Sequence, residues 1–122
     1  MAKYLTVVGN ASDSPIRLTN TESERDTCEI QTSGLMHTKG GGSNLSIPNC
    51  SGVNYFKDHH MLVQATDGSW EMSLWTDDDA DFVIHWSWGE TFDGADAVEG
   101  SGDYDQCMLL IDSNGNPSFF PF

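Results

Sequence analysis

Short runs in which hydrophobic and polar residues alternate make up most of the chain. The first run, residues 4–8, sets Leu5 and Val7 on one face, and residues 61–88 carry the longest pattern of this kind. A period of two residues is typical of β-strands, and no segment shows the 3.6-residue apolar stripe of an amphipathic helix. We therefore predict an all-β fold, a single-domain antiparallel β-sandwich of about eight strands over residues 1–122.

Residues 61–88 are predicted to form a three-stranded meander. Asp67 and Gly68 are typical of a tight hairpin turn that needs positive φ angles. A hairpin closed there pairs apolar residues on one face, namely Ala65 with Trp70, Val63 with Met72 and Met61 with Leu74. Continuing this face across the acidic turn at residues 77–81 pairs the third strand as Leu74 with Phe82, Met72 with Ile84 and Trp70 with Trp86.

The opposite face of this meander carries the predicted ligand site. The expected pairing places there three rows, which are His60, Trp75 and Asp81, then Leu62, Ser73 and Val83, then Gln64, Glu71 and His85. An exposed indole ring can stack on a sugar ring, while carboxylates accept hydrogen bonds from sugar hydroxyls. The predicted ligand-binding residues are therefore Trp75, Ser73, Glu71 and His85. The alternative is that a second sheet, or the long loop expected after Trp88, covers Trp75.

Charge narrows the classes of ligand. The net charge is −14, and thirteen of the 19 acidic residues lie after His60, where no Lys or Arg follows. A surface of this kind repels nucleic-acid phosphates and anionic lipid headgroups. We expect no nucleic-acid partner and no binding to anionic membranes, and we favour cations, polyols or basic partners. The simpler alternative is that the acidity only keeps the protein soluble.

A second candidate site combines histidine and aspartate. The expected pairing brings residues 58–60 to the acidic turn at 77–81. Imidazole and carboxylate ligands suit zinc, manganese or iron when one coordination position stays open. The candidate metal ligands are Asp58, His59, His60, Asp77, Asp79 and Asp81. Against such a site, adjacent histidines in a strand point to opposite faces, and the segment lacks HExxH-type spacing.

Calcium is another candidate cation for the acidic turn. Asp77, Asp79 and Asp81 alternate as at the start of an EF-hand loop, but Phe82 and Trp88 stand where that loop needs glycine and glutamate. The turn is therefore no EF-hand, and calcium or another divalent cation is expected only in a different geometry. The remaining alternative is a solvated acidic turn that prevents edge-to-edge pairing of the hairpin.

The cysteines and the first residues bear on the cellular compartment. The start, MAKYLTVVGN, lacks the apolar core of a signal peptide, which predicts a cytoplasmic protein and leaves leaderless secretion open. Cys28, Cys50 and Cys107 share no short metal-ligand spacing, so reduced thiols are expected, with a bridge between Cys28 and Cys50 as the alternative.

These patterns predict a non-catalytic protein that binds a small molecule or a glycan. No serine or cysteine nucleophile has a base at a recognisable spacing. Lectin-like carbohydrate binding, assisted by a cation, is the favoured function. The alternatives are a metal-dependent enzyme that uses residues 58–60 and 77–81, and a lipid- or membrane-binding defence protein. Membrane binding is disfavoured by the charge, and the oligomeric state is left open.

Overall fold

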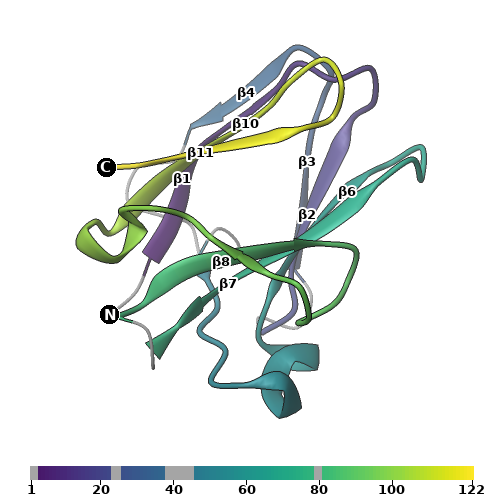
Figure 1. The fold of residues 1–122 in the computed structure, drawn as a ribbon. Helices are drawn as coiled ribbons and strands as arrows, with labels where there is room; N and C mark the ends of the chain where they lie inside the picture. The colour runs from purple at the N-terminus through teal and green to yellow at the C-terminus, as the bar shows by residue number, and fades with distance from the viewer. Residues whose placement is uncertain (1–2, 23–25, 38–45, 79–80) are drawn as a thin grey trace.

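The computed structural model describes residues 3–22, 26–37, 46–78 and 81–122. They form a sandwich of two sheets, with β1, β4, β10 and β11 grouped apart from β2, β3, β6, β7 and β8 (Figure 1). The predicted all-β sandwich is confirmed. Within the described residues no helix is long and apolar enough to cross a membrane.

The first sheet has five strands in the order β11-β10-β1-β4, with β5 also paired to β1; their bounds are β1 Lys3–Asn10, β4 Gly34–His37, β5 Ser46–Ile47, β10 Gln106–Ile111 and β11 Pro117–Pro121. The second sheet has six strands in the order β3-β2-β6-β7-β8-β9; their bounds are β2 Ile16–Asn20, β3 Asp26–Ile30, β6 Met61–Ala65, β7 Glu71–Asp77, β8 Val83–Trp88 and β9 Asp96–Ala97. The 3₁₀ helices η2 (Val53–Asp58) and η4 (Ser101–Asp103) lie between strands. The described strands outnumber the eight expected, because several of them are very short. The pairing of β1 with β10 is parallel, whereas antiparallel sheets were expected.

A bulge in β1 changes which of its side chains enter the core. Leu5 pairs with Cys107 and Val7 with Met108, so Thr6 is an extra residue between two partners. The extra residue shifts the alternation by one position. Leu5 and Val8 are therefore both fully buried, whereas Val7 lies on the outer face. The expected alternation of Leu5 with Val7 stops at this bulge.

The register of the meander is confirmed for its first two strands and wrong for the third. Met61 opposes Leu74 and Val63 opposes Met72, as the hairpin pattern predicts. Of the two turn residues, only Gly68 has a positive φ, at 81°. In the third strand Trp88 opposes Met72, Trp86 opposes Leu74 and Ile84 opposes Thr76. This pairing is four residues away from the predicted one, because β7 runs on to Asp77 and β8 begins only at Val83.

The main core lies between the two sheets and takes side chains from both. A shift of four residues is even, so the predicted apolar face of β8 still points inward. Ile84 is buried, and Trp86 packs against the core with its ring centroid 5.9 Å from that of Phe119 on β11. The central side chains, all at most 1% exposed, are Leu5, Val8, Ile16, Leu18, Met61, Val63, Met72, Leu74, Ile84, Cys107, Leu109 and Ile111. Cys28, Cys50 and Cys107 are free thiols.

The bulge residue gives a stability prediction. The Thr6 hydroxyl is buried and has no hydrogen-bond partner in the described part of the chain. Replacing an unpaired buried hydroxyl by a methyl group removes its desolvation penalty. We expect Thr6→Val to raise the free energy of unfolding by about 1 kcal/mol in urea denaturation.

Thr21→Val is the matched control for this substitution. The Thr21 hydroxyl donates to the carbonyl oxygen of His60 at 2.8 Å and accepts from the His60 amide at 3.0 Å. Its loss should lower the free energy of unfolding by about 1–3 kcal/mol. A Thr6→Val protein as destabilised as Thr21→Val would contradict the assignment of Thr6 as unpaired.

Candidate functional site

The face predicted to hold a ligand is covered in the structure. Trp75 is 1% exposed, so its predicted exposure is wrong and the alternative of a covering loop is correct. Phe56 of η2 meets the indole edge-on at a centroid distance of 5.3 Å. Phe92, which follows β8, stacks on the indole at 5.2 Å, and Ala95 packs against the same cluster. The outer face of the second sheet therefore carries a small second core.

The other predicted ligand residues follow from the corrected register. His85 opposes Trp75 in the ladder, and the two rings stack at a centroid distance of 6.3 Å. Ser73 is buried and donates to the carbonyl oxygen of Gly89 at 2.8 Å. Glu71 is half-buried opposite Gln64, away from His85 in the ladder. Trp75 and His85 are neighbours, but these four residues form no open face.

The predicted metal ligands are dispersed. His60 does not flank Trp75 together with Asp81, because Asp81 lies in the turn before β8 with a φ of 57°. That turn borders a pocket of about 500 Å³ shared with Gly102 and Asp103. Asp77 ends β7, Asp58 ends η2, and Asp79 falls outside the described residues. Nowhere in the described ranges do three or more His, Cys, Asp or Glu residues gather in a way that could hold a metal ion.

His59 and His60 instead make separate contacts with two different glutamates. The Nδ1 atom of His59 lies 2.7 Å from Glu22 Oε2 at the surface. His60 is buried, and its Nδ1 donates to the carbonyl oxygen of Phe56 at 2.6 Å, since a carbonyl can only accept. Its Nε2 lies 2.8 Å from Glu90 Oε2, and its ring stacks on Phe56 at 4.1 Å. His60 therefore ties η2 to the segment that covers Trp75.

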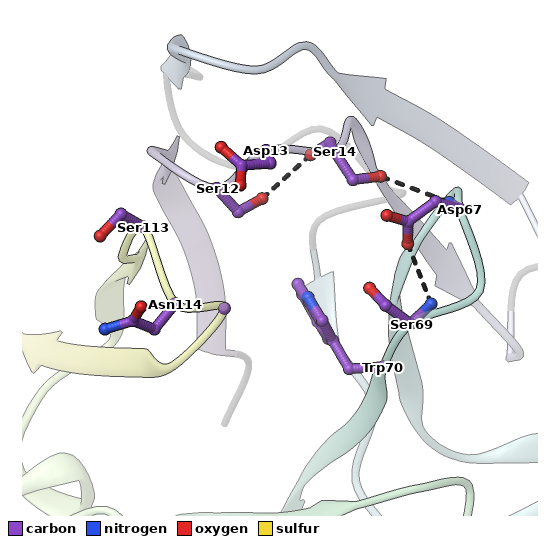
Figure 2. A pocket seen from close by; sticks show the side chains of 9 residues that line it. Ser12, Asp13, Ser14, Asp67, Ser69, Trp70, Ser113 and Asn114 are labelled. Atoms are coloured by element: carbon purple, nitrogen blue, oxygen red, sulfur yellow. Dashed lines mark hydrogen bonds between the residues drawn. The ribbon is translucent and has the colours of Figure 1, made fainter.

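A polar pocket lies at one end of the sandwich, where three connections meet (Figure 2). They are the β1–β2 connection, the β6–β7 turn and the β10–β11 turn. We call this space, of about 190 Å³, the end pocket. It is lined by Ser12, Asp13, Ser14, Asp67, Ser69, Trp70, Ser113, Asn114 and Gly115.

Trp70 forms a wall of the end pocket and contacts the opposite sheet through Gly115. Figure 2 shows its ring standing between the turn that carries Ser69 and the turn that carries Asn114. Gly115 has a φ of 79°, and a Cβ atom there would lie only 2.8 Å from Trp70 Nε1. The turn thus requires glycine both for its backbone and for the approach of the indole. The half-buried ring also packs against the main core and meets Trp88 edge-on at a centroid distance of 6.2 Å.

Hydrogen bonds fix the polar walls of the pocket. Asn10 is buried at the end of β1, and its amide donates to the carbonyl oxygens of Ser14 at 2.9 Å and Ile30 at 3.2 Å. Its Oδ1 accepts from the Ser12 amide at 3.0 Å. The Ser14 hydroxyl accepts from the Asp67 amide at 3.3 Å, which links the β1–β2 connection to the β6–β7 turn. The walls are therefore preformed.

The two carboxylates of the pocket differ in their bonding. Asp67 Oδ1 accepts from the Ser69 amide at 2.9 Å, and hydrogen bonds from the Ser69 side chain and backbone hold the pKa of Asp67 below its ordinary value. Asp13 is exposed and makes no hydrogen bond within the described part of the chain. The Asp67 carboxylate is thus held in place by its own turn, whereas the Asp13 carboxylate is available to a ligand.

The chemistry of the lining favours binding of an uncharged or cationic polar ligand. An indole ring stands beside two carboxylates, several hydroxyls and one carboxamide, and none of the residues that line the pocket is Lys, Arg, His or Cys. The carboxylates accept hydrogen bonds and repel anions. Sequence reasoning predicted the β6–β7 turn at Asp67 and Gly68, but it did not bring the three connections together, because the lining residues are spread from Ser12 to Gly115.

Comparisons with known proteins do not identify this chain. Neither protein-family models, nor curated proteins, nor solved structures give a match. The function is therefore inferred from the geometry and chemistry of the end pocket.

The contacts of the two histidines predict unequal effects on stability. His60→Phe keeps a ring stacked on Phe56 but removes the bonds to the Phe56 carbonyl and to Glu90. We expect a loss of about 1–3 kcal/mol in the free energy of unfolding, measured by urea denaturation. His59→Phe removes only a surface pair and should cost less than about 1 kcal/mol. Equal effects of the two substitutions would argue against the role given to His60.

The bonding of Asp67 predicts a pH effect. Because the folded-state pKa of Asp67 is lowered, the group stabilises the fold above its unfolded-state pKa, and this contribution is lost as the pH falls through the folded-state value. Ser69→Ala removes the side-chain donor and should raise the pKa of Asp67, measured by NMR titration of its carboxyl carbon. An unchanged Asp67 pKa in Ser69→Ala would contradict the assigned bond.

Proposed function

We propose that the protein is a non-catalytic, lectin-like carbohydrate-binding protein and that its sugar site is the end pocket. The observation that carries this proposal is that Trp70, the two aspartates Asp13 and Asp67, and Asn114 line one pocket although they come from three separate connections. An aromatic ring supplies the apolar surface on which a sugar ring stacks, and the polar groups around it bind the hydroxyls.

Binding is favoured over hydrolysis by the state of the carboxylates. Glycosidases need one carboxylic acid that is protonated at the working pH in order to donate to the leaving oxygen. Hydrogen bonds from Ser69 lower the pKa of Asp67, which makes this carboxylate a poor proton donor. Asp13 is exposed to water and lacks the apolar surroundings in which a catalytic carboxylic acid is held. The pocket therefore has hydrogen-bond acceptors for a sugar but no suitable acid.

The charge of the site restricts the class of sugar. Two carboxylates line the pocket, and the whole chain carries a net charge of −14. An acidic sugar would bring a further negative charge close to Asp13 and Asp67, whereas neutral and amino sugars would not. Assistance by calcium or another divalent cation stays a prediction from the sequence. Measuring glycan binding with and without EDTA tests whether a divalent cation assists.

The proposal predicts selective binding on a glycan array. We expect signals for neutral or amino sugars and none for sialylated or uronic-acid glycans, because the carboxylates repel the acidic sugars. Trp70→Ala and Asn114→Ala should each weaken binding about tenfold in isothermal titration, equivalent to about 1.4 kcal/mol. Asn114 is exposed, so its substitution tests the site even if loss of the half-buried Trp70 perturbs the fold.

Tyr55→Ala is the control for these variants. Tyr55 is 58% exposed on η2, away from the end pocket, and its removal should leave sugar binding unchanged. Absence of binding to every glycan, with and without EDTA, would exclude the proposed function. Binding that neither Trp70→Ala nor Asn114→Ala weakens would place the sugar elsewhere.

A further inference from the structure

An apolar groove lies on the outer face of the first sheet. Its volume is about 570 Å³, which falls in the range of small-molecule sites. Gly9 and Leu110 line the groove, and a Cβ atom at Gly9 would lie 2.7 Å from Leu110 Cδ2 and 3.5 Å from Leu35 Cδ1. Leu35 is 70% exposed, Leu110 36% and Phe120 47%. Neighbouring apolar side chains that stay this exposed are typical of a binding surface.

The sheet register places these side chains together. Gly9 pairs with Leu110 on one side and with Leu35 on the other. Phe120 pairs with Met108, two residues before Leu110 on β10. Side chains two residues apart in a strand share a face, so Leu110, Leu35 and Phe120 all lie on the side away from the core. Because Gly9 has no side chain, the Leu110 side chain lies close over it.

The groove and the end pocket lie on either side of the same two connections. Ala11 and Asp112 line the groove, while the next residues along the chain, Ser12 and Ser113, line the end pocket. The two connections are joined where the Ala11 amide donates to the carbonyl oxygen of Ile111 at 2.8 Å. The two sites are therefore lined by consecutive residues of both connections.

From this continuity we infer that the ligand is a sugar with an apolar aglycone, which binds as a single molecule. The sugar occupies the end pocket, and the alkyl or aryl aglycone lies in the groove against Leu110 and Phe120. This inference rests on the proposed function, since the sugar site is the end pocket. It adds that the aglycone contributes affinity through a second, apolar subsite.

Charge favours a single amphiphilic molecule over larger occupants of the groove. Asp112 lines the groove and Asp13 lines the end pocket, and both are exposed. Inserting this part of the surface into a bilayer would take their carboxylates out of water. A second copy of the chain would bring another net charge of −14 against the same face. The aglycone of a single glycoside avoids both the desolvation and the charge repulsion, because it enters the groove while the carboxylates of Asp13 and Asp112 stay in water.

Isothermal titration with paired glycosides tests the inference. The probes are methyl and octyl β-glycosides of glucose, galactose, mannose and N-acetylglucosamine, used below their micelle concentrations. For any sugar that binds, we expect the octyl glycoside to bind at least about tenfold more tightly than the methyl glycoside, because each buried methylene is worth about 0.8 kcal/mol. Leu110→Thr and Phe120→Thr should remove this gain and leave methyl glycoside binding unchanged.

Val53→Thr is the matched control, because Val53 is 60% exposed on η2, outside the groove. It should leave both affinities unchanged. If methyl glycosides bind and octyl glycosides bind no more tightly, the inference is overturned while the proposed function stands. If no glycoside of either kind binds, the proposed function fails and the inference with it. Equal binding of octane-1,2-diol would show a groove that works without the sugar and would overturn the inference.

Discussion

The contact between the Trp70 ring and the backbone of Gly115 joins the two sheets at the end of the sandwich that carries the candidate site. Trp70 precedes β7 in one sheet, and Gly115 lies in the turn between β10 and β11 of the other. The approach is so close that no side chain fits at Gly115. This contact fixes the position of the indole ring, which forms one wall of the end pocket. The other walls come from the three connections that surround the ring.

The two outer faces of the sandwich differ in a way that bears on function. The face beyond the second sheet is covered by η2 and by the segment after β8, which bury Trp75 between Phe56 and Phe92. His60 ties these two segments together. The face of the first sheet around Leu110 and Phe120 is exposed instead. The aromatic residue that looked most available in the sequence is thus part of a core, and the open apolar surface lies on the other sheet.

The register of β8 shows that an alternating pattern predicts which face of a strand is buried but does not predict the pairing partners. Phe82, Ile84, Trp86 and Trp88 are all apolar, so sliding the strand by two or four residues keeps apolar side chains facing inward. The pattern therefore predicts the face but leaves the register open. The turn settles it, because Asp81 and Phe82 take positive φ angles and leave the strand. The expected grouping of His60, Trp75 and Asp81 depended on that register and is absent for this reason.

The sequence by itself determined the strand content, the sandwich class, the β6–β7 pairing and the strongly acidic surface, because these follow from local alternation, turn residues and composition. Only the tertiary structure decided which surfaces are open. The lining of the end pocket comes from residues as far apart in the sequence as Ser12 and Gly115, brought together by the pairing of β1 with β10 and by the packing of the sheets. Burial of Trp75 likewise depends on distant segments that fold over it. Local periodicity indicates which face a side chain takes, but only packing determines whether another segment covers that face.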